Sequence, residues 1–133
     1  MLRAVAQKHL MGCGIACIAC VSGINYSKTI KLVESKNAST KGYYCKDIIN
    51  ALRKLRLKYD YKKVTYKTKK YLKKEGSIVF IKRSSEYPKG HYLVKVNKGW
   101  MNPWINYPSM PAKAGFNKEL PGKAQWVIFQ KQT

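Results

Sequence analysis

A chain of 133 residues carries a formal net charge of +21, from 27 Lys and Arg residues against 6 Asp and Glu, and 45% of its residues are hydrophobic. From that length we expect a single domain, residues 1–133, with a core of its own, and no fused transporter or ATPase. No apolar run reaches the ~20 residues of a membrane span. Gly122-Lys123-Ala124 lacks the residues that flank the lysine of a phosphate-binding loop, so nucleotide binding is not expected.

The positive charge comes almost entirely from lysine, since the arginines are only Arg3, Arg53, Arg56 and Arg83. Lysine is a hydrated point charge that suits bidentate phosphate recognition poorly, so a lysine-rich solvated surface is the favoured interpretation. Attraction to an acidic peptide, nucleic acid or anionic membrane is the alternative. Lysines alternate with tyrosines over residues 58–74. This pattern can stack on bases, but it also fits an edge strand followed by a helix, so nucleic acid is possible but not favoured.

Helices are predicted in the first part of the chain. An apolar run predicts a helix over residues 13–22 that ends at Gly23, and Ser27 is the expected N-cap of a second helix over 28–35. Residues 37–42 are expected to form a loop. A third helix is predicted over 44–57, with an inward face made of Ile48, Ile49, Leu52, Leu55 and Leu57.

Strands are predicted in the second part, over residues 59–66, 77–82, 90–97, 100–104 and 124–131, with a short helix near 69–74. Residues 107–122 contain three prolines and are expected to be the most mobile loop. Helices followed by an antiparallel sheet are typical of an α+β protein, with N-terminal helices packed on a C-terminal sheet.

Three of the four cysteines lie in the first predicted helix. Cys13, Cys17 and Cys20 have a C-x3-C-x2-C spacing, and with Cys45 they are candidate ligands of a metal or cluster. Steps of four and three place the three thiols on one helical face among apolar residues, which is more typical of core. We therefore expect no metal site, and we expect a reducing, cytoplasmic setting without disulfide bonds.

Cys13 is the strongest candidate for a reactive residue. It follows Gly12 at the start of the first helix, where unpaired backbone N–H groups favour a thiolate. His91 begins a later strand, and a polar side chain able to orient the imidazole follows it in Asn102-Pro103. His9 is closer in sequence, but it lies on the turn before the helix and is a weaker candidate for the base. A cleaved signal peptide here would remove the thiol, so that interpretation is not favoured.

The candidate residues form a motif with a defined order and spacing along the chain. Gln7, then five residues, Cys13-Gly14, an apolar helix, a Gly-His-Tyr-Leu-Val segment at 90–94 and Asn102-Pro103 follow one another. The arrangement resembles the papain-like cysteine peptidases that process double-glycine leader peptides of bacteriocins, over roughly residues 3–108.

The resemblance implies a role for each matching residue. Gln7 would help to bind the oxyanion, Cys13 would attack, His91 would be its base and Asn102 would orient His91. The chain differs from the family in having Gly12 where an acidic residue is usual, and Asn102 where the family has Asp. Trp100 and Trp104 flank Asn102, and we expect both to face away from it. No cofactor is implied.

The sequence thus predicts a thiol-dependent peptidase that cleaves a peptide bond after small residues, often paired glycines. Its expected partners are a peptide or protein substrate and a separate transporter or export partner. The alternative is a papain-like module of weak or no activity that binds a peptide, nucleic acid or acidic partner through its basic surface. The two differ in whether the Cys13 thiol is reactive and lies near His91.

Overall fold

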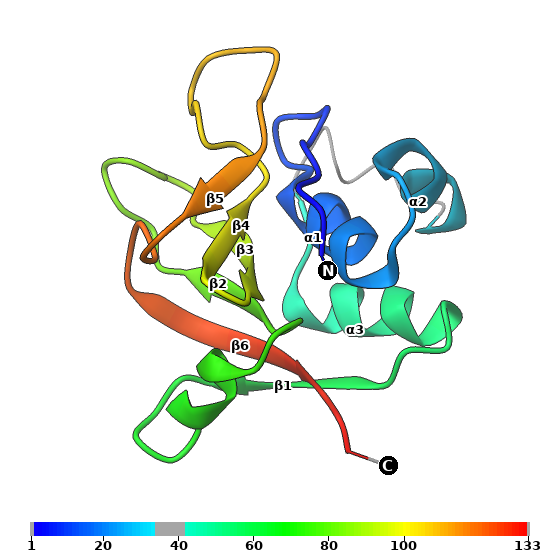
Figure 1. Ribbon diagram of the computed structural model, residues 1–133, viewed down its shortest axis with the longest axis vertical. Helices are drawn as coiled ribbons and strands as arrows, with labels where there is room; N and C mark the ends of the chain where they lie inside the picture. Colours follow the sequence, from blue (N-terminus) through cyan, green and yellow to red (C-terminus); the bar gives the residue numbers. More distant parts are fainter. Residues whose placement is uncertain (1, 34–41, 133) are drawn as a thin grey trace.

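The computed structural model describes residues 2–33 and 42–132. Within them, three α-helices come first and a six-stranded antiparallel sheet follows, with the helices gathered on one side of the sheet (Figure 1). This confirms the predicted α+β class and the packing of N-terminal helices on a C-terminal sheet.

Helix α1, Cys13–Ser22, has the predicted bounds. Gly12 is its N-cap, and Gly23 closes it in the left-handed conformation at φ 76°, which glycine adopts without a steric cost. Ile15 and Ile18 are fully buried. α1 packs on strand β3 and between the other two helices, so its first residue is held against the sheet.

Helix α2, Tyr26–Val33, begins before the predicted residue 28. Ser27 is not its N-cap, because the Asn25 side chain accepts the Lys28 N–H at 2.7 Å. Asn at this position satisfies an otherwise unpaired helix donor. The predicted end at residue 35 and the loop over 37–41 lie outside the described residues.

Helix α3, Cys45–Lys54, is shorter than the predicted 44–57. The Asp47 side chain accepts the Tyr44 N–H at 2.8 Å and fixes its start. Its end is a turn in which Arg56 adopts φ 64° and the Leu57 N–H donates to Leu52 O at 2.9 Å. The predicted inward residues of this segment belong to or pack against the core.

The sheet runs in the order β1-β6-β2-β3-β4-β5, with every neighbouring pair antiparallel. Its strands are β1 Tyr59–Lys63, β2 Ile78–Ile81, β3 His91–Val96, β4 Gly99–Asn102, β5 Gly115–Asn117 and β6 Ala124–Gln130. A 3-10 helix, η2 Lys69–Lys73, connects β1 to β2 in the place where a short helix was predicted.

Two strand predictions need correction. β4 ends at Asn102 rather than residue 104, because Pro103 has no N–H and the Trp104 N–H turns back to the Asn102 side chain at 2.9 Å. The segment 107–122 is not one long loop, since it contains β5, which pairs with β4 through Asn102↔Gly115 and its neighbours.

Apolar side chains cover both faces of the sheet. Ile78 and Val94 pack under the helices with Ile15, whereas Val79 and Leu93 belong to a second cluster on the opposite face. The alternation follows the two-residue period of a strand. His91 and Asn102 have the same parity as Leu93 and Trp100, so both point toward the second cluster.

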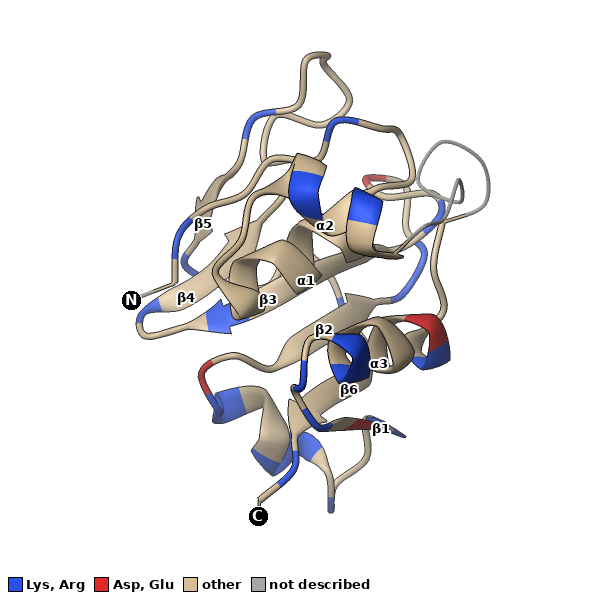
Figure 2. Cartoon of the chain, turned by 90° about the vertical axis from the view of Figure 1, so that its right-hand side faces the viewer, with Lys and Arg blue, Asp and Glu red and all other residues tan. Residues whose placement is uncertain are grey.

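Lysine and arginine are spread over the surface of helices, strand ends and loops, with a group on η2 (Figure 2). Acidic residues are few beside them. Among the helices of the described residues, none is both long and apolar enough to cross a membrane.

Candidate active site

His91 and Asn102 meet at one end of the sheet. His91 is the first residue of β3 and Asn102 the last of the neighbouring β4. His91 Nε2 and Asn102 Oδ1 are 2.8 Å apart, and the two side chains are 3% and 1% exposed. The eleven-residue spacing in the sequence therefore corresponds to a buried hydrogen bond.

The surrounding bonds assign the protons of this pair. The Trp104 N–H donates to Asn102 Oδ1, which identifies that atom as the oxygen, while Asn102 Nδ2 donates to Asn117 Oδ1 at 2.8 Å and Tyr87 OH at 3.2 Å. Because Oδ1 only accepts, His91 Nε2 must carry its proton. The neutral ring then has its lone pair on Nδ1, which is the nitrogen left to act as a base.

Tyr87 covers one face of the imidazole. The two rings are stacked, with centroids 4.4 Å apart and planes 7° apart. Burial lowers the pKa of His91 to about 4, and the hydrogen bond that His91 donates to Asn102 offsets only part of that effect. His91 is therefore neutral at neutral pH, as a general base must be before it takes a proton.

Cys13 is the first residue of α1 and is partly exposed. Backbone N–H groups of Tyr92, Gly14 and Cys13 itself lie at the sulfur and lower its pKa. Tyr92 directly follows His91, so the helix brings the thiol to the start of the histidine strand. Within the described residues, no hydrogen bond joins Cys13 to His91; such bonds are often long in free enzymes and tighten with substrate.

Burial dominates the titration of this thiol. It raises the pKa of Cys13 to about 11, against the smaller effect of the three N–H groups. The expectation that the helix start favours a thiolate is therefore wrong for the free site, because loss of hydration costs the anion more than the N–H groups return. The resting pair is a thiol and a neutral imidazole.

Gln7 lies beside Pro103, the residue that follows Asn102, and is 2% exposed. Its backbone N–H donates to Pro103 O at 3.2 Å, and its side-chain Nε2 donates to His9 O at 2.9 Å and Leu10 O at 3.2 Å. Its Oε1 is buried, and none of the residues that the structure describes bonds to it. In this conformation both Nε2 hydrogens of Gln7 bond to carbonyl oxygens of the turn before Cys13 and stabilise that turn.

The sequence offered two alternatives to this site: His9 as the base, and a metal site at the cysteines. His9 Nδ1 is 2.9 Å from the Tyr26 hydroxyl on α2, so this ring is engaged away from the sheet. Cys17 and Cys20 are buried in the core. Across residues 2–33 and 42–132, no three His, Cys, Asp or Glu side chains form a group able to hold a metal ion.

The expected orientation of the tryptophans is wrong. Trp100 lies two residues from Asn102 on β4, so it shares its face, together with Tyr87. Trp104 lies beyond the strand, is 3% exposed, and packs edge-on against Tyr107 with ring centroids 4.7 Å apart. Tyr87 and Asn117 were not singled out from the sequence, because nothing local marks a side chain that contacts Asn102 from 15 residues away.

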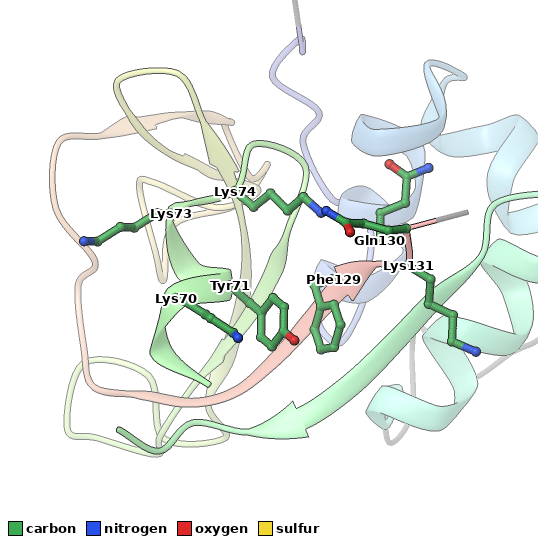
Figure 3. A pocket seen from close by; sticks show the side chains of 8 residues that line it. Lys70, Tyr71, Lys73, Lys74, Phe129, Gln130 and Lys131 are labelled. Atoms are coloured by element: carbon green, nitrogen blue, oxygen red, sulfur yellow. The ribbon is translucent and has the colours of Figure 1, made fainter. Parts of the chain in front are cut away.

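A concave surface of about 790 Å³ lies away from these residues. Lysines surround it, and Tyr71 and Phe129 stack on each other within it at 3.8 Å between centroids (Figure 3). It is at the Phe129 end of β6, whereas His91 is linked through Ile81 to Ala124 at the other end. We call it the lysine groove.

Comparison with known proteins shows the family of the chain. The model of the peptidase C39 family matches residues 2–119, which include Gln7, Cys13, His91 and Asn102. The chain belongs to the peptidase C39 family. It is therefore a member of a cysteine peptidase family, which confirms the resemblance seen in the sequence.

One similar solved structure is the peptidase domain of Streptococcus ComA, a bi-functional ABC transporter involved in a quorum sensing pathway. The match has a TM-score of 0.56 at 20% identity and covers 100% of both chains, which supports the C39 fold. No curated protein sequence matches this chain significantly.

Proposed function

We propose that this C39 peptidase cleaves a peptide bond after small residues, of the double-glycine leader type, with Cys13 as nucleophile and His91 as base. The observation that carries the proposal is the network around Asn102. It leaves the lone pair of His91 on Nδ1, on the strand whose next residue, Tyr92, directs its N–H at the Cys13 sulfur.

The first half of the reaction forms a thioester. His91 Nδ1 accepts the proton of the Cys13 thiol while the sulfur attacks the substrate carbonyl, and the carbonyl electron pair moves onto its oxygen. Because the free pair is neutral, proton transfer accompanies carbon–sulfur bond formation instead of preceding it. The imidazolium then gives its proton to the leaving amine as the carbon–nitrogen bond breaks.

The second half releases the acid. His91 Nδ1 takes a proton from a water molecule whose oxygen attacks the thioester, and the proton returns to the Cys13 sulfur as the carbon–sulfur bond breaks. Asn102 Oδ1 holds His91 Nε2–H throughout, so the ring keeps one tautomer and one orientation.

Oxyanion binding is assigned to the Cys13 N–H and to Gln7. The N–H groups in the first turn of a helix have no helical partner, so the Cys13 N–H, which lies at the sulfur in the resting site, can turn to a developing negative charge on the substrate oxygen. Gln7 Nε2 joins it when the longer of its two bonds, 3.2 Å to Leu10 O, opens on substrate binding.

The substrate class rests on the family resemblance. Paired glycines before the cut carry no side chains that would obstruct approach to a partly buried thiol. A transporter partner belongs to the same proposal, since the ComA peptidase domain is part of an ABC transporter.

The test is cleavage of a fluorogenic peptide that ends in Gly-Gly before an aminocoumarin. The unchanged enzyme should release the fluorophore. Cys13→Ala should abolish release, and Asn102→Ala should lower kcat by roughly 10²-fold or more because the tautomer and orientation of His91 are lost.

Cys45→Ala is the matched control, since Cys45 is also a partly exposed cysteine that begins a helix. It should retain activity. A peptide with Leu-Leu before the cut should be a poor substrate. Turnover by Cys13→Ala, or equal turnover of both peptides, would refute the nucleophile or the specificity, respectively.

A further inference from the structure

The turn that leads into helix α1 is held by hydrogen bonds between its own residues. Gly12 N–H donates to His9 O at 3.1 Å, and the Gln7 amide holds His9 O and Leu10 O. The first bond of α1 follows at once, from Ala16 N–H to Gly12 O at 3.1 Å. The position of Gly12 therefore sets where Cys13 begins the helix.

Helix α2 contacts the same turn through Tyr26. Tyr26, the first residue of α2, is 3% exposed, and its ring stacks on His9 with centroids 5.7 Å apart. Its hydroxyl is 2.9 Å from His9 Nδ1. Burial raises the pKa of Tyr26 to about 12, so the hydroxyl keeps its proton at any ordinary assay pH.

The same hydroxyl occupies the space beside Gly12. A methyl group added to Gly12 would overlap the Tyr26 hydroxyl oxygen, whereas the next atoms, Tyr26 Cζ and His9 O, would be 3.2 and 3.3 Å away. The backbone of Gly12, at φ −94° and ψ 11°, has a negative φ and lies in a bridge region that residues other than glycine also adopt. The hydroxyl, and not backbone strain, therefore requires glycine directly before the nucleophile.

We propose that Tyr26 is a positioning residue for Cys13: its hydroxyl, seated on Gly12 and bonded to His9, fixes the turn that places the Cys13 sulfur at the start of β3. This inference rests on the proposed role of Cys13 as nucleophile. Tyr26 does not touch the reacting atoms; it acts through Gly12, the residue next to Cys13.

The test is a double-mutant cycle of Tyr26→Phe and Gly12→Ala. Each variant is measured by kcat and KM on the Gly-Gly aminocoumarin peptide, by the rate of iodoacetamide alkylation at Cys13, and by urea unfolding. Mass spectrometry resolves Cys13 from Cys45, whose alkylation rate reports general exposure.

Tyr26→Phe should lower kcat and Cys13 alkylation by roughly tenfold, with KM and Cys45 unchanged, because displacements of about 1 Å can cost 10²-fold in rate. Gly12→Ala alone should lose more activity and stability. The double variant should recover part of both relative to Gly12→Ala, since the overlapping oxygen is gone. Tyr43→Phe removes a buried hydroxyl that has no hydrogen-bond partner among residues 2–33 and 42–132, and it should leave kcat unchanged.

Additive effects in the cycle, or an unchanged kcat in Tyr26→Phe, would overturn the inference. The readouts separate it from the proposed function, because alkylation and unfolding need no turnover. Coupling between positions 12 and 26 without peptide cleavage would refute only the proposed function. Cleavage that depends on Cys13 without such coupling would refute only the role of Tyr26.

Discussion

At His91, burial and hydrogen bonding act on the imidazole in opposite directions. Burial lowers its pKa from 6.5 to about 4, and Asn102 Oδ1 counteracts this in part by accepting the Nε2 proton. The unfolded chain therefore binds a proton between those pH values that the folded chain does not. Stability should rise with pH across this window and be lost as the pH falls through it.

The size of this effect makes it measurable. The free energy of unfolding should fall by about 3 kcal/mol from pH 6.5 to pH 4 through His91 alone, at 1.36 kcal/mol per pKa unit. Urea unfolding of the wild type and His91→Gln across this range gives the contribution by difference. An equal slope in the wild type and in His91→Gln would contradict the assigned burial of a neutral imidazole.

Site residues that a local sequence motif marks could be predicted. Residues that reach the site only through the fold could not. Cys13 was marked by the helix start, and Asn102 by the Asn-Pro pair that follows the histidine strand. Tyr26, Tyr87 and Asn117 contact the site from other elements, and no local signal identifies them. The protonation of Cys13 was misjudged because helix-end N–H groups are visible in a sequence whereas burial of the sulfur is not.

Among the elements, α1 was predicted to the residue because two glycines bound a continuous apolar run. β5 was missed because three residues between prolines carry no periodicity, and its pairing with β4 is what brings Asn117 to Asn102. The start of α2 was misplaced because Asn25 and Ser27 are both good N-cap residues, and only the fold selects between them.

That choice of cap can be tested directly. Asn25→Ala should reduce the free energy of unfolding by about 1 kcal/mol, because the Lys28 N–H loses its acceptor. Ser27→Ala is the matched control and should change stability by less than about 0.5 kcal/mol, since Ser27 only accepts a bond from the exposed Lys8 ammonium group. Urea unfolding of the two variants would contradict this account if Ser27→Ala were the more destabilising.

Over the whole molecule, the proposed site and the lysine groove lie at different ends of the sheet. The proposed site lies where α1 meets the first residue of β3, and the lysine groove lies at the far end of β6. Sequence order indicated helices followed by a sheet, but not the insertion of β6 between β1 and β2, which depends on long-range pairing. The tyrosines that alternate with lysines proved to be partly packed, with Tyr71 on Phe129 and Tyr61 against Trp126.

The central claim is that Cys13 is the nucleophile and that His91 activates it. The most direct measurement is modification by a peptide chloromethyl ketone ending in Gly-Gly, with the modified residue identified by peptide mapping and the rate followed by intact mass. The account predicts modification at Cys13, roughly tenfold or more slower in His91→Ala, and unchanged in Lys70→Glu in the lysine groove. Equal modification of Cys45, or a Cys13 rate that His91→Ala does not alter, would contradict it.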